Sequence, residues 1–451
     1  MNHSQKHFIV VIGGSVAGSE AAYQLAQRDF RVIVFDQSTL PYGKIEDGLP
    51  LWHVKLRDKE ERIIDEKLSH KNIWYVPEVK LGKDVNIEDV ARNWGVSAVL
   101  IATGAWKDRE LPISNEQDFI NKGLIYQNPF MYWFNHKHEP GYSGPVFKVK
   151  DETLVIGGGL ASFDVIKACM IELVQQALQK LGISLTLFDL EHNIKRVLDS
   201  YDLTLQDLGI KGCTLVYRRY AKDMPLSDRQ RNSPEEKSKA EQISQKILNN
   251  FTSKFLFKFE ELLSPIKGIA DTAGNLSAMV FQKMSVENGK PEARKTKTLK
   301  CSQAISSIGS LPEIFEGIPF DGSVYKISDP TTSRIEGFEN VFAIGNAVTG
   351  RGNIRESVKH GKETTLNIVD DYLAIEADNF SNNLRNQENN ISFSTNGISK
   401  LVQNKSFQDD AVIQSILQKI SDMQRKNGSD VNYWDWIAAH KPVRLEELIG
   451  K

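Results

Sequence analysis

The chain has 451 residues, far more than one small hydrophobic core needs, and this length predicts two or three domains. Hydrophobic residues make up 40% of the sequence, which excludes disorder or collagen-like repetition for most of it. Lysine and arginine (56) nearly balance aspartate and glutamate (58), so the net charge of −2 gives no general electrostatic reason to bind nucleic acid or anionic lipid.

The three cysteines, Cys169, Cys213 and Cys301, lie too far apart for a C-x-x-C pair or a clustered metal-ligand spacing. We therefore expect no metal site and no disulfide framework. The longest apolar runs fall short of the ~20 residues that cross a bilayer, and residues 1–7 lack the charged-then-apolar layout of a secretion signal. A cytoplasmic protein with reduced thiols and no membrane attachment is the expectation.

The first predicted unit is a βαβ unit at the N-terminus. Residues 8–12 form a continuous apolar run, typical of a parallel strand covered on both faces. Residues 16–28 have a helical pattern with small residues, and residues 31–35 return to a strand that ends at Asp36.

The turn after the first strand nearly matches the dinucleotide fingerprint G-x-G-x-x-G. It reads Gly13, Gly14, Ser15, Val16, Ala17 and Gly18. Ser15 stands at the second glycine, where the backbone approaches a pyrophosphate, and is small enough to be tolerated. Asp36 is the acid expected to receive the ribose hydroxyls. The alternative is a tight structural turn without a nucleotide.

Two short apolar strands at 99–104 and 304–309 look like crossings between this unit and an inserted one. The predicted fold is therefore α/β, with two Rossmann-like dinucleotide-binding domains, the second inserted into the first. We place the boundaries at residues 1–106 and 322–451 for the outer domain, which ends in a helical extension, and 107–321 for the insertion.

The inserted domain starts with a strand at 154–156 and a glycine-rich turn, followed by a helix to about Leu181. The turn reads Gly157, Gly158, Gly159, Leu160, Ala161 and Ser162. About 60 residues later, a strand at 214–217 delivers Arg218 and Arg219. Guanidinium groups at the end of such a strand match the 2′-phosphate of NADP, whereas an acid there favours NAD. The alternative is a solvent-exposed arginine pair.

Two further segments are predicted from composition. Residues 235–249 are polar and helix-prone, as in a solvated surface helix. Residues 376–406 are rich in Asn, Ser and Gln, so we expect a mobile excursion there, before helical residues at about 409–425.

The outer domain then returns with a strand and turn at 340–346, followed by Gly350-Arg351-Gly352-Asn353-Ile354 and a helix-like segment. Backbone amides at such a helix start can cradle the polar edge of a flavin. The candidate residues here are Gly345, Asn346, Gly352, Asn353 and Ile354; the alternative is an ordinary β-turn-α join. An acid in the first unit and an arginine pair in the second predict FAD first and NADPH second, and hence hydride transfer.

Several segments are similar to the adrenodoxin-reductase-type ferredoxin–NADP reductases. They are Pro41-Tyr42-Gly43 through Pro50 to His53-Val54-Lys55, Ala102-Thr103-Gly104-Ala105, Phe130 with Trp133-Phe134-Asn135, residues 305–309, residues 319–321 and Tyr433-Trp434-Asp435-Trp436. Tyr217-Arg218-Arg219 with Asp223-Met224-Pro225 also resembles the NADPH-binding segment of the related glutamate synthase small subunit. That subunit has a cysteine-rich N-terminal region, whereas here no cysteine precedes residue 169. Ser15, Ser162 and Asn346 depart from the first family's pattern.

The resemblance implies an FAD-dependent NADPH oxidoreductase that passes electrons to a ferredoxin-like iron–sulfur protein or a flavodoxin. It places Gly104 at the FAD and His53 near the flavin, where His53 serves a proton path or is a structural residue. Arg229, Arg231, Arg351 and Arg355 are candidates for a basic patch facing an acidic partner; the alternative is solvated charges without a partner. The alternatives are an NADPH-oxidising subunit of a larger enzyme and a flavin-binding scaffold or sensor without turnover. The oligomeric state is not predicted.

Overall fold

The computed structural model describes residues 6–226, 233–287, 290–349 and 372–450. The chain divides into two compact units. The first comprises Met1–Leu49, His53–Lys107 and Ser310–Lys451, and the second comprises Pro50–Trp52 and Asp108–Gly309. Each unit has its own parallel sheet with helices, so the predicted α/β class with two Rossmann-like domains is confirmed.

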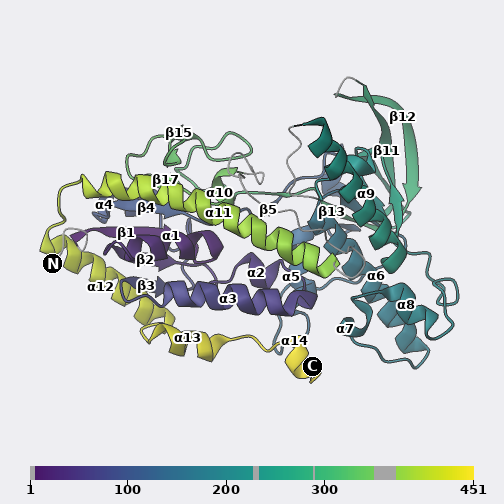
Figure 1. Cartoon of the computed structure of the whole chain (residues 1–451), viewed down its shortest axis with the longest axis horizontal. Coiled ribbons are helices and arrows are strands. Elements are labelled where there is room, and N and C mark those ends of the chain that lie inside the picture. Colours follow the sequence, from purple (N-terminus) through teal and green to yellow (C-terminus); the bar gives the residue numbers. More distant parts are fainter. Residues whose placement is uncertain (1–5, 227–232, 288–289, 350–371, 451) are drawn as a thin grey trace. The chain divides into compact units, whose positions relative to one another are not determined.

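The first unit is built on a seven-stranded sheet (Figure 1). In spatial order its strands are β15 (Ile327–Asp329), β16 (Arg334–Ile335), β17 (Val341–Ala343), β4 (Ala98–Ile101), β1 (Phe8–Ile12), β2 (Arg31–Phe35) and β3 (Ile73–Val76). β17, β4, β1, β2 and β3 are parallel neighbours, while β15 and β16 form an antiparallel edge. The carboxyl ends of β1, β2 and β4 therefore meet at one edge, where ligands bind in such sheets.

Alternate side chains of β1 enter two separate apolar clusters, one on each face of this sheet. On one face Phe8, Val10 and Ile12 pack in a cluster that includes residues of α4 (Ile87–Asn93) and α12 (Asp410–Asn427). On the other face Ile9 and Val11 pack in a cluster that includes residues of α1 (Val16–Ala26) and α11 (Tyr372–Gln403). This double coverage explains why the whole strand is apolar.

The remaining helices of the first unit are short except for α3. They are α2 (Lys44–Asp47), α3 (Val54–Leu68), α10 (Asn346–Thr349), α13 (Tyr433–His440) and α14 (Leu445–Leu448), with a 3₁₀ turn at Leu51–His53 where the chain passes between the units. The chain passes between the units at two further places, at the strands β5 (Lys107–Asp108) and β14 (Ser310–Leu311). No helix in the described ranges is long and apolar enough to cross a membrane.

The second unit has a five-stranded parallel sheet and a three-stranded antiparallel sheet. The parallel strands in order are β6 (Leu124–Tyr126), β13 (Gln303–Ser307), β7 (Thr153–Gly157), β8 (Thr214–Val216) and β9 (Lys258–Glu260), and the antiparallel strands are β10 (Leu263–Ala270), β11 (Leu276–Glu287) and β12 (Lys290–Lys300). Its helices are α5 (Gln127–His136), α6 (Leu160–Lys180), α7 (Leu187–Leu190), α8 (Ile194–Asp199) and α9 (Pro234–Phe255), with 3₁₀ turns at Glu116–Asp118 and Ala221–Asp223.

The domain boundary expected at residue 321 differs from the division into compact units. Residues 310–321 group with the first unit, because Phe315 and Ile318 are buried in the same apolar cluster as Phe8. The assignment of FAD to the first unit and NADPH to the second stays a prediction.

The expectation of a mobile excursion at 376–406 is wrong. Residues 372–403 form the helix α11, which packs along α1 (Figure 1). The polar composition hides an apolar stripe in which Ile391, Ile398 and Val402 are each at most 2% exposed. These positions recur at helical spacing, so one face of the helix is buried although its composition is polar.

The two other helices expected from the sequence are present. α9 extends the expected helix at 235–249 at both ends, and its start is fixed by a capping box between Ser233 and Glu236 with proline at the first helical position. α12 matches the helix expected at 409–425.

Candidate functional site: two dinucleotide-type sites

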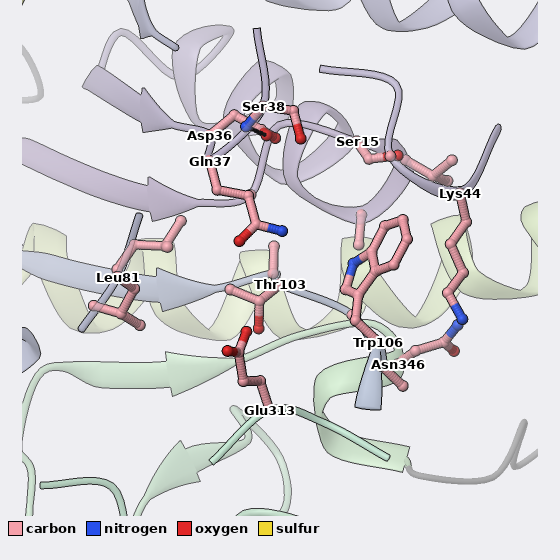
Figure 2. A pocket seen from close by; sticks show the side chains of 18 of the residues that line it. Ser15, Asp36, Gln37, Ser38, Lys44, Leu81, Thr103, Trp106, Glu313 and Asn346 are labelled. Carbon is pink, nitrogen blue, oxygen red and sulfur yellow. Dashed lines mark hydrogen bonds between the residues drawn. The ribbon is translucent and has the colours of Figure 1, made fainter. Parts of the chain in front are cut away.

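The first unit contains a pocket of about 250 Å³ at the carboxyl edge of its sheet (Figure 2). Its lining combines the turn after β1, the loop after β2, the segment after β4 and the start of α10. The lining residues are Ile12, Gly13, Ser15, Val16, Ala17, Asp36, Gln37, Ser38, Gly43, Lys44, Ile45, Val79, Lys80, Leu81, Ala102, Thr103, Gly104, Ala105, Trp106, Glu313, Phe315 and Asn346.

The glycines of the first turn are required by close backbone approach. Gly13 has φ of +102°, and a Cβ there would lie 2.6 Å from the carbonyl oxygen of Ala102. A Cβ on Gly18 would lie 1.7 Å from the carbonyl oxygen of Gly13. The first glycine thus makes the tight turn and the last lets α1 pack against β1, as the fingerprint demands.

Ser15, which replaces the second glycine of the fingerprint, turns its side chain away from α1. Its hydroxyl donates to the carbonyl oxygen of Tyr42 at 2.8 Å and does not cap the helix. Gly43 faces it, since a Cβ on Gly43 would lie 3.0 Å from the Ser15 side chain. The start of α1 therefore keeps backbone N–H groups available for an anion.

Asp36 lines the pocket beside the glycine turn. Its Oδ2 accepts from the Gly14 N–H at 2.7 Å and its Oδ1 from the Ser38 N–H at 2.9 Å. Burial raises its pKa to about 6, against the opposing effect of these two hydrogen bonds. Because each carboxylate oxygen has a second lone pair, Asp36 can still accept hydroxyl donors from a ligand.

Sequence reasoning missed several pocket side chains. Lys44 Nζ lies 5.2 Å from the ring centroid of Trp106 and 3.4 Å from the Ser310 hydroxyl. Across the pocket, Lys80 Nζ lies 3.4 Å from Glu313 Oε1. These residues come from loops without a motif, and only the position of Lys44 directly after the quoted Pro41-Tyr42-Gly43 segment gave a signal.

The return segment brings other predicted residues to the same pocket. Gly104 and Asn346 line it, and Gly345 closely approaches α1, since a Cβ there would lie 2.7 Å from the Ala17 Cβ. The predicted flavin-edge residues Gly352, Asn353 and Ile354 lie outside the described residues, as do Arg229, Arg231, Arg351 and Arg355.

His53 ends the 3₁₀ turn before α3 and is 6% exposed. It is not among the residues that line the pocket of the first unit. Its proton-transfer role stays a prediction.

The second unit repeats the turn with different side chains. A Cβ on Gly157 would lie 2.3 Å from the carbonyl oxygen of Ser307, and one on Gly158 would lie 2.1 Å from the ring of Tyr217. Gly159 is the N-cap of α6, whose first residues are Leu160 and Ala161. Ser162 replaces the last glycine, and its hydroxyl donates to the Gly159 carbonyl at 2.6 Å. The start of α6 is again uncapped by a side chain.

Arg218 and Arg219 follow β8, which runs parallel to β7, so the arginine pair lies at the same edge as the glycine turn. The contact between Tyr217 and Gly158 ties the two segments together. Both arginines are exposed, and within the described part of the chain neither guanidinium has a carboxylate within ion-pair distance. Their charge is therefore available to an anion at this edge.

Comparison with known proteins supports this architecture. Residues 7–208 match the model of the pyridine nucleotide-disulphide oxidoreductase family. The glutamate synthase [NADPH] small chain of Azospirillum brasilense is 22% identical over 366 residues, which is 79% of this chain and 65% of that protein. The mitochondrial NADPH:adrenodoxin oxidoreductase of Drosophila melanogaster is 27% identical over 155 residues, 34% of this chain and 32% of that protein. In each case the chain spans less than two thirds of the relative's length.

Among solved structures, Mycobacterium tuberculosis FprA in complex with NADPH aligns with a TM-score of 0.63 at 18% identity. The alignment covers 93% of this chain and 91% of FprA. At this identity the match establishes the shared fold. The resemblance inferred from the sequence is thus confirmed: the chain is similar to an adrenodoxin oxidoreductase and to glutamate synthase small chains, and its residues 7–208 match the pyridine nucleotide-disulphide oxidoreductase family model.

Proposed function

We propose that this protein is an FAD-dependent NADPH oxidoreductase that delivers electrons to a ferredoxin-like iron–sulfur protein. The observation that carries the proposal is the contrast between the two glycine turns of the described chain. One is paired with the carboxylate Asp36 and the other with the cations Arg218 and Arg219.

The pocket of the first unit fits FAD. Gly13 makes the tight turn and Gly18 lets α1 pack closely against β1. The uncapped start of α1 offers N–H donors to a pyrophosphate, and Asp36 offers acceptors to ribose hydroxyls. Gly104 and Asn346 border the same pocket, where Asn346 can both donate to and accept from a polar ligand edge.

The second unit fits NADPH. The uncapped start of α6 faces a pyrophosphate, while Arg218 and Arg219 supply charged donor forks for the 2′-phosphate. When bound, FAD would supply the conversion between two-electron hydride chemistry and one-electron transfer. The chain's own residues bind and orient the two nucleotides, and no side-chain nucleophile is needed.

A second candidate function is an NADPH-oxidising subunit of a larger enzyme. It is favoured by the length of the match to the glutamate synthase small chain and by a 22% match, covering 81% of this chain and 44% of the relative, to the NADP(+)-dependent formate dehydrogenase subunit beta of Moorella thermoacetica. A flavin-binding scaffold without turnover is the third. We propose the cytoplasm as the compartment, because Cys169, Cys213 and Cys301 are buried free thiols.

Three measurements separate these functions. Flavin absorbance of the purified protein tests FAD binding, and NADPH oxidation with a one-electron dye tests turnover. Single-turnover reduction of a panel of iron–sulfur proteins and flavodoxins by the NADPH-reduced protein tests the electron acceptor. If the protein reduces the dye but none of the protein acceptors, the result favours the subunit function. If it reduces neither the dye nor a protein acceptor, it is not a reductase.

A further inference from the structure

One wall of the pocket in the first unit is a single loop between β2 and α3. We call residues 37–47 the pocket loop. Five of its residues line the pocket: Gln37, Ser38, Gly43, Lys44 and Ile45. Their neighbours Thr39 and Glu46 do not line the pocket and are held elsewhere.

Thr39 and Glu46 are both held by residues 429–450, which we call the C-terminal segment. Trp436 Nε1 donates to the Thr39 carbonyl oxygen at 2.8 Å. Arg444 Nη1 donates to Glu46 Oε2 at 2.8 Å. Each held residue directly follows a pocket-lining residue, Ser38 or Ile45, so these two contacts fix the course of the loop at both ends.

A third connection runs through Asp65 of α3. Tyr433 of the C-terminal segment donates to Asp65 Oδ1 at 2.8 Å, and Tyr42 of the pocket loop donates to Asp65 Oδ2 at 3.1 Å. Tyr42 also accepts from Ser15 through its carbonyl oxygen. The C-terminal segment is thus connected to the glycine turn of the first unit through hydrogen bonds.

The Arg444 contact is buried and charged. Arg444 is 4% exposed and its Nη2 lies 2.5 Å from Glu61 Oε1, while Glu46 also pairs with Arg57 at 2.5 Å. Two arginines therefore face two carboxyl groups, and all four residues are at most 7% exposed. Loss of one partner from such a buried pair is strongly destabilising, because the other partner is left as an uncompensated buried charge.

We propose that Arg444 and Trp436 are positioning residues for the flavin pocket, which hold the pocket loop in its ligand-binding course from the side opposite to the ligand. This inference rests on the proposed function, since it takes FAD to be the ligand of the pocket. It assigns a binding role to a segment far from the glycine fingerprint in sequence.

The test compares two conservative variants with matched controls. Arg444→Lys keeps the charge but loses the planar fork, and its control is Arg425→Lys, at an exposed pair with Asp422. Trp436→Phe keeps an aromatic ring but loses the N–H donor, and its control is the exposed Trp434→Phe on the same helix. FAD release from the holoprotein is followed by flavin fluorescence after dilution, and backbone hydrogen exchange is measured for residues 37–47 and for β1.

Release is expected to accelerate about 3–10-fold in Trp436→Phe, the effect of one lost hydrogen bond, and at least as much in Arg444→Lys. Exchange is expected to rise in the pocket loop but not in β1, and the two controls are expected to match the parent. If release is unchanged in both variants, or if exchange rises equally in β1 and the loop, the positioning role is wrong and the contacts only stabilise the fold. A parent that binds no FAD overturns the proposed function and this inference together, whereas a parent that binds FAD beside unaffected variants overturns the inference alone.

Discussion

Two opposing effects determine the pKa of the Asp36 carboxyl group. Burial raises its pKa from 3.8 to about 6, while the N–H groups of Gly14 and Ser38 favour its ionised form. In the protein without flavin, the raised pKa contributes stability that is complete below pH ~4 and is lost as the pH rises through ~6. Binding of a ligand that donates hydroxyl groups instead favours the ionised form of Asp36, because the carboxylate is the better acceptor.

FAD affinity should therefore fall as the pH falls through 6. At pH 5 only about one tenth of Asp36 is ionised, so the dissociation constant should be roughly tenfold higher than at pH 7. Asp36→Asn should weaken FAD binding at pH 7 and remove this pH dependence. Titration of the flavin-free protein with FAD at both pH values measures the effect, and an unchanged pH dependence in the variant would assign it to another group.

Arg218 and Arg219 are expected to set the preference for NADPH over NADH. Charge-assisted hydrogen bonds make a preference of roughly tenfold to several-hundredfold plausible from one contact. Replacing both residues with Ala should raise the KM for NADPH strongly and that for NADH little, with flavin content unchanged.

Arg196→Ala, at an exposed position on α8, is the control for this pair and should leave both constants unchanged. The assignment of the pair to the 2′-phosphate is refuted if the parent uses NADH as efficiently as NADPH. It is also refuted if the double variant loses both cofactors equally.

At the scale of elements, substitutions in α11 test whether residues 376–403 form a packed helix. Ile398 is fully buried on the side that packs against α1, while Leu401 is 40% exposed on the same helix. Ile398→Ala should lower the free energy of unfolding by about 2–5 kcal/mol, because it removes buried methyl groups and leaves a cavity. Leu401→Ala should cost far less, and equal small losses in urea unfolding would mean that this segment is not packed.

The elements that sequence predicted well are those with strong local signals. The run at residues 8–12, the two glycine turns and the helix-prone composition of 235–249 predicted β1, the starts of α1 and α6, and α9. The polar composition of residues 376–406 conceals the helical spacing of Ile391, Ile398 and Val402, so α11 was not predicted. The contributions of Trp106 and Glu313 to the pocket depend on tertiary folding, because no motif contains them.

At the scale of the whole molecule, the second unit is almost continuous in sequence and has its own sheets and apolar cluster. A fragment of residues 108–309 should therefore fold alone and bind 2′,5′-ADP without any flavin. Retention on a 2′,5′-ADP resin, with circular dichroism as the test of folding, measures this. A folded fragment that passes through the resin, or one that binds equally well after both arginines are replaced, would contradict the assignment of this unit to NADPH.

The insertion also dictates an order of events during synthesis. β4 has no partner on its outer edge until β17, at residues 341–343, has left the ribosome. The cover of the two faces of the first sheet, begun by α1 and α4, is completed by Ile391 and Ile398 on one side and Ile413 and Ile416 on the other, which emerge later still. The second unit ends at residue 309, so the ribosome completes it while the first unit still exposes an open strand edge and apolar faces. Domains generally fold as units as they emerge, and here the N-terminal residues belong to the unit that finishes last. The edge of β4 that pairs with β17 thus stays open through the whole translation of the insertion, and an open strand edge is a site where another chain can pair.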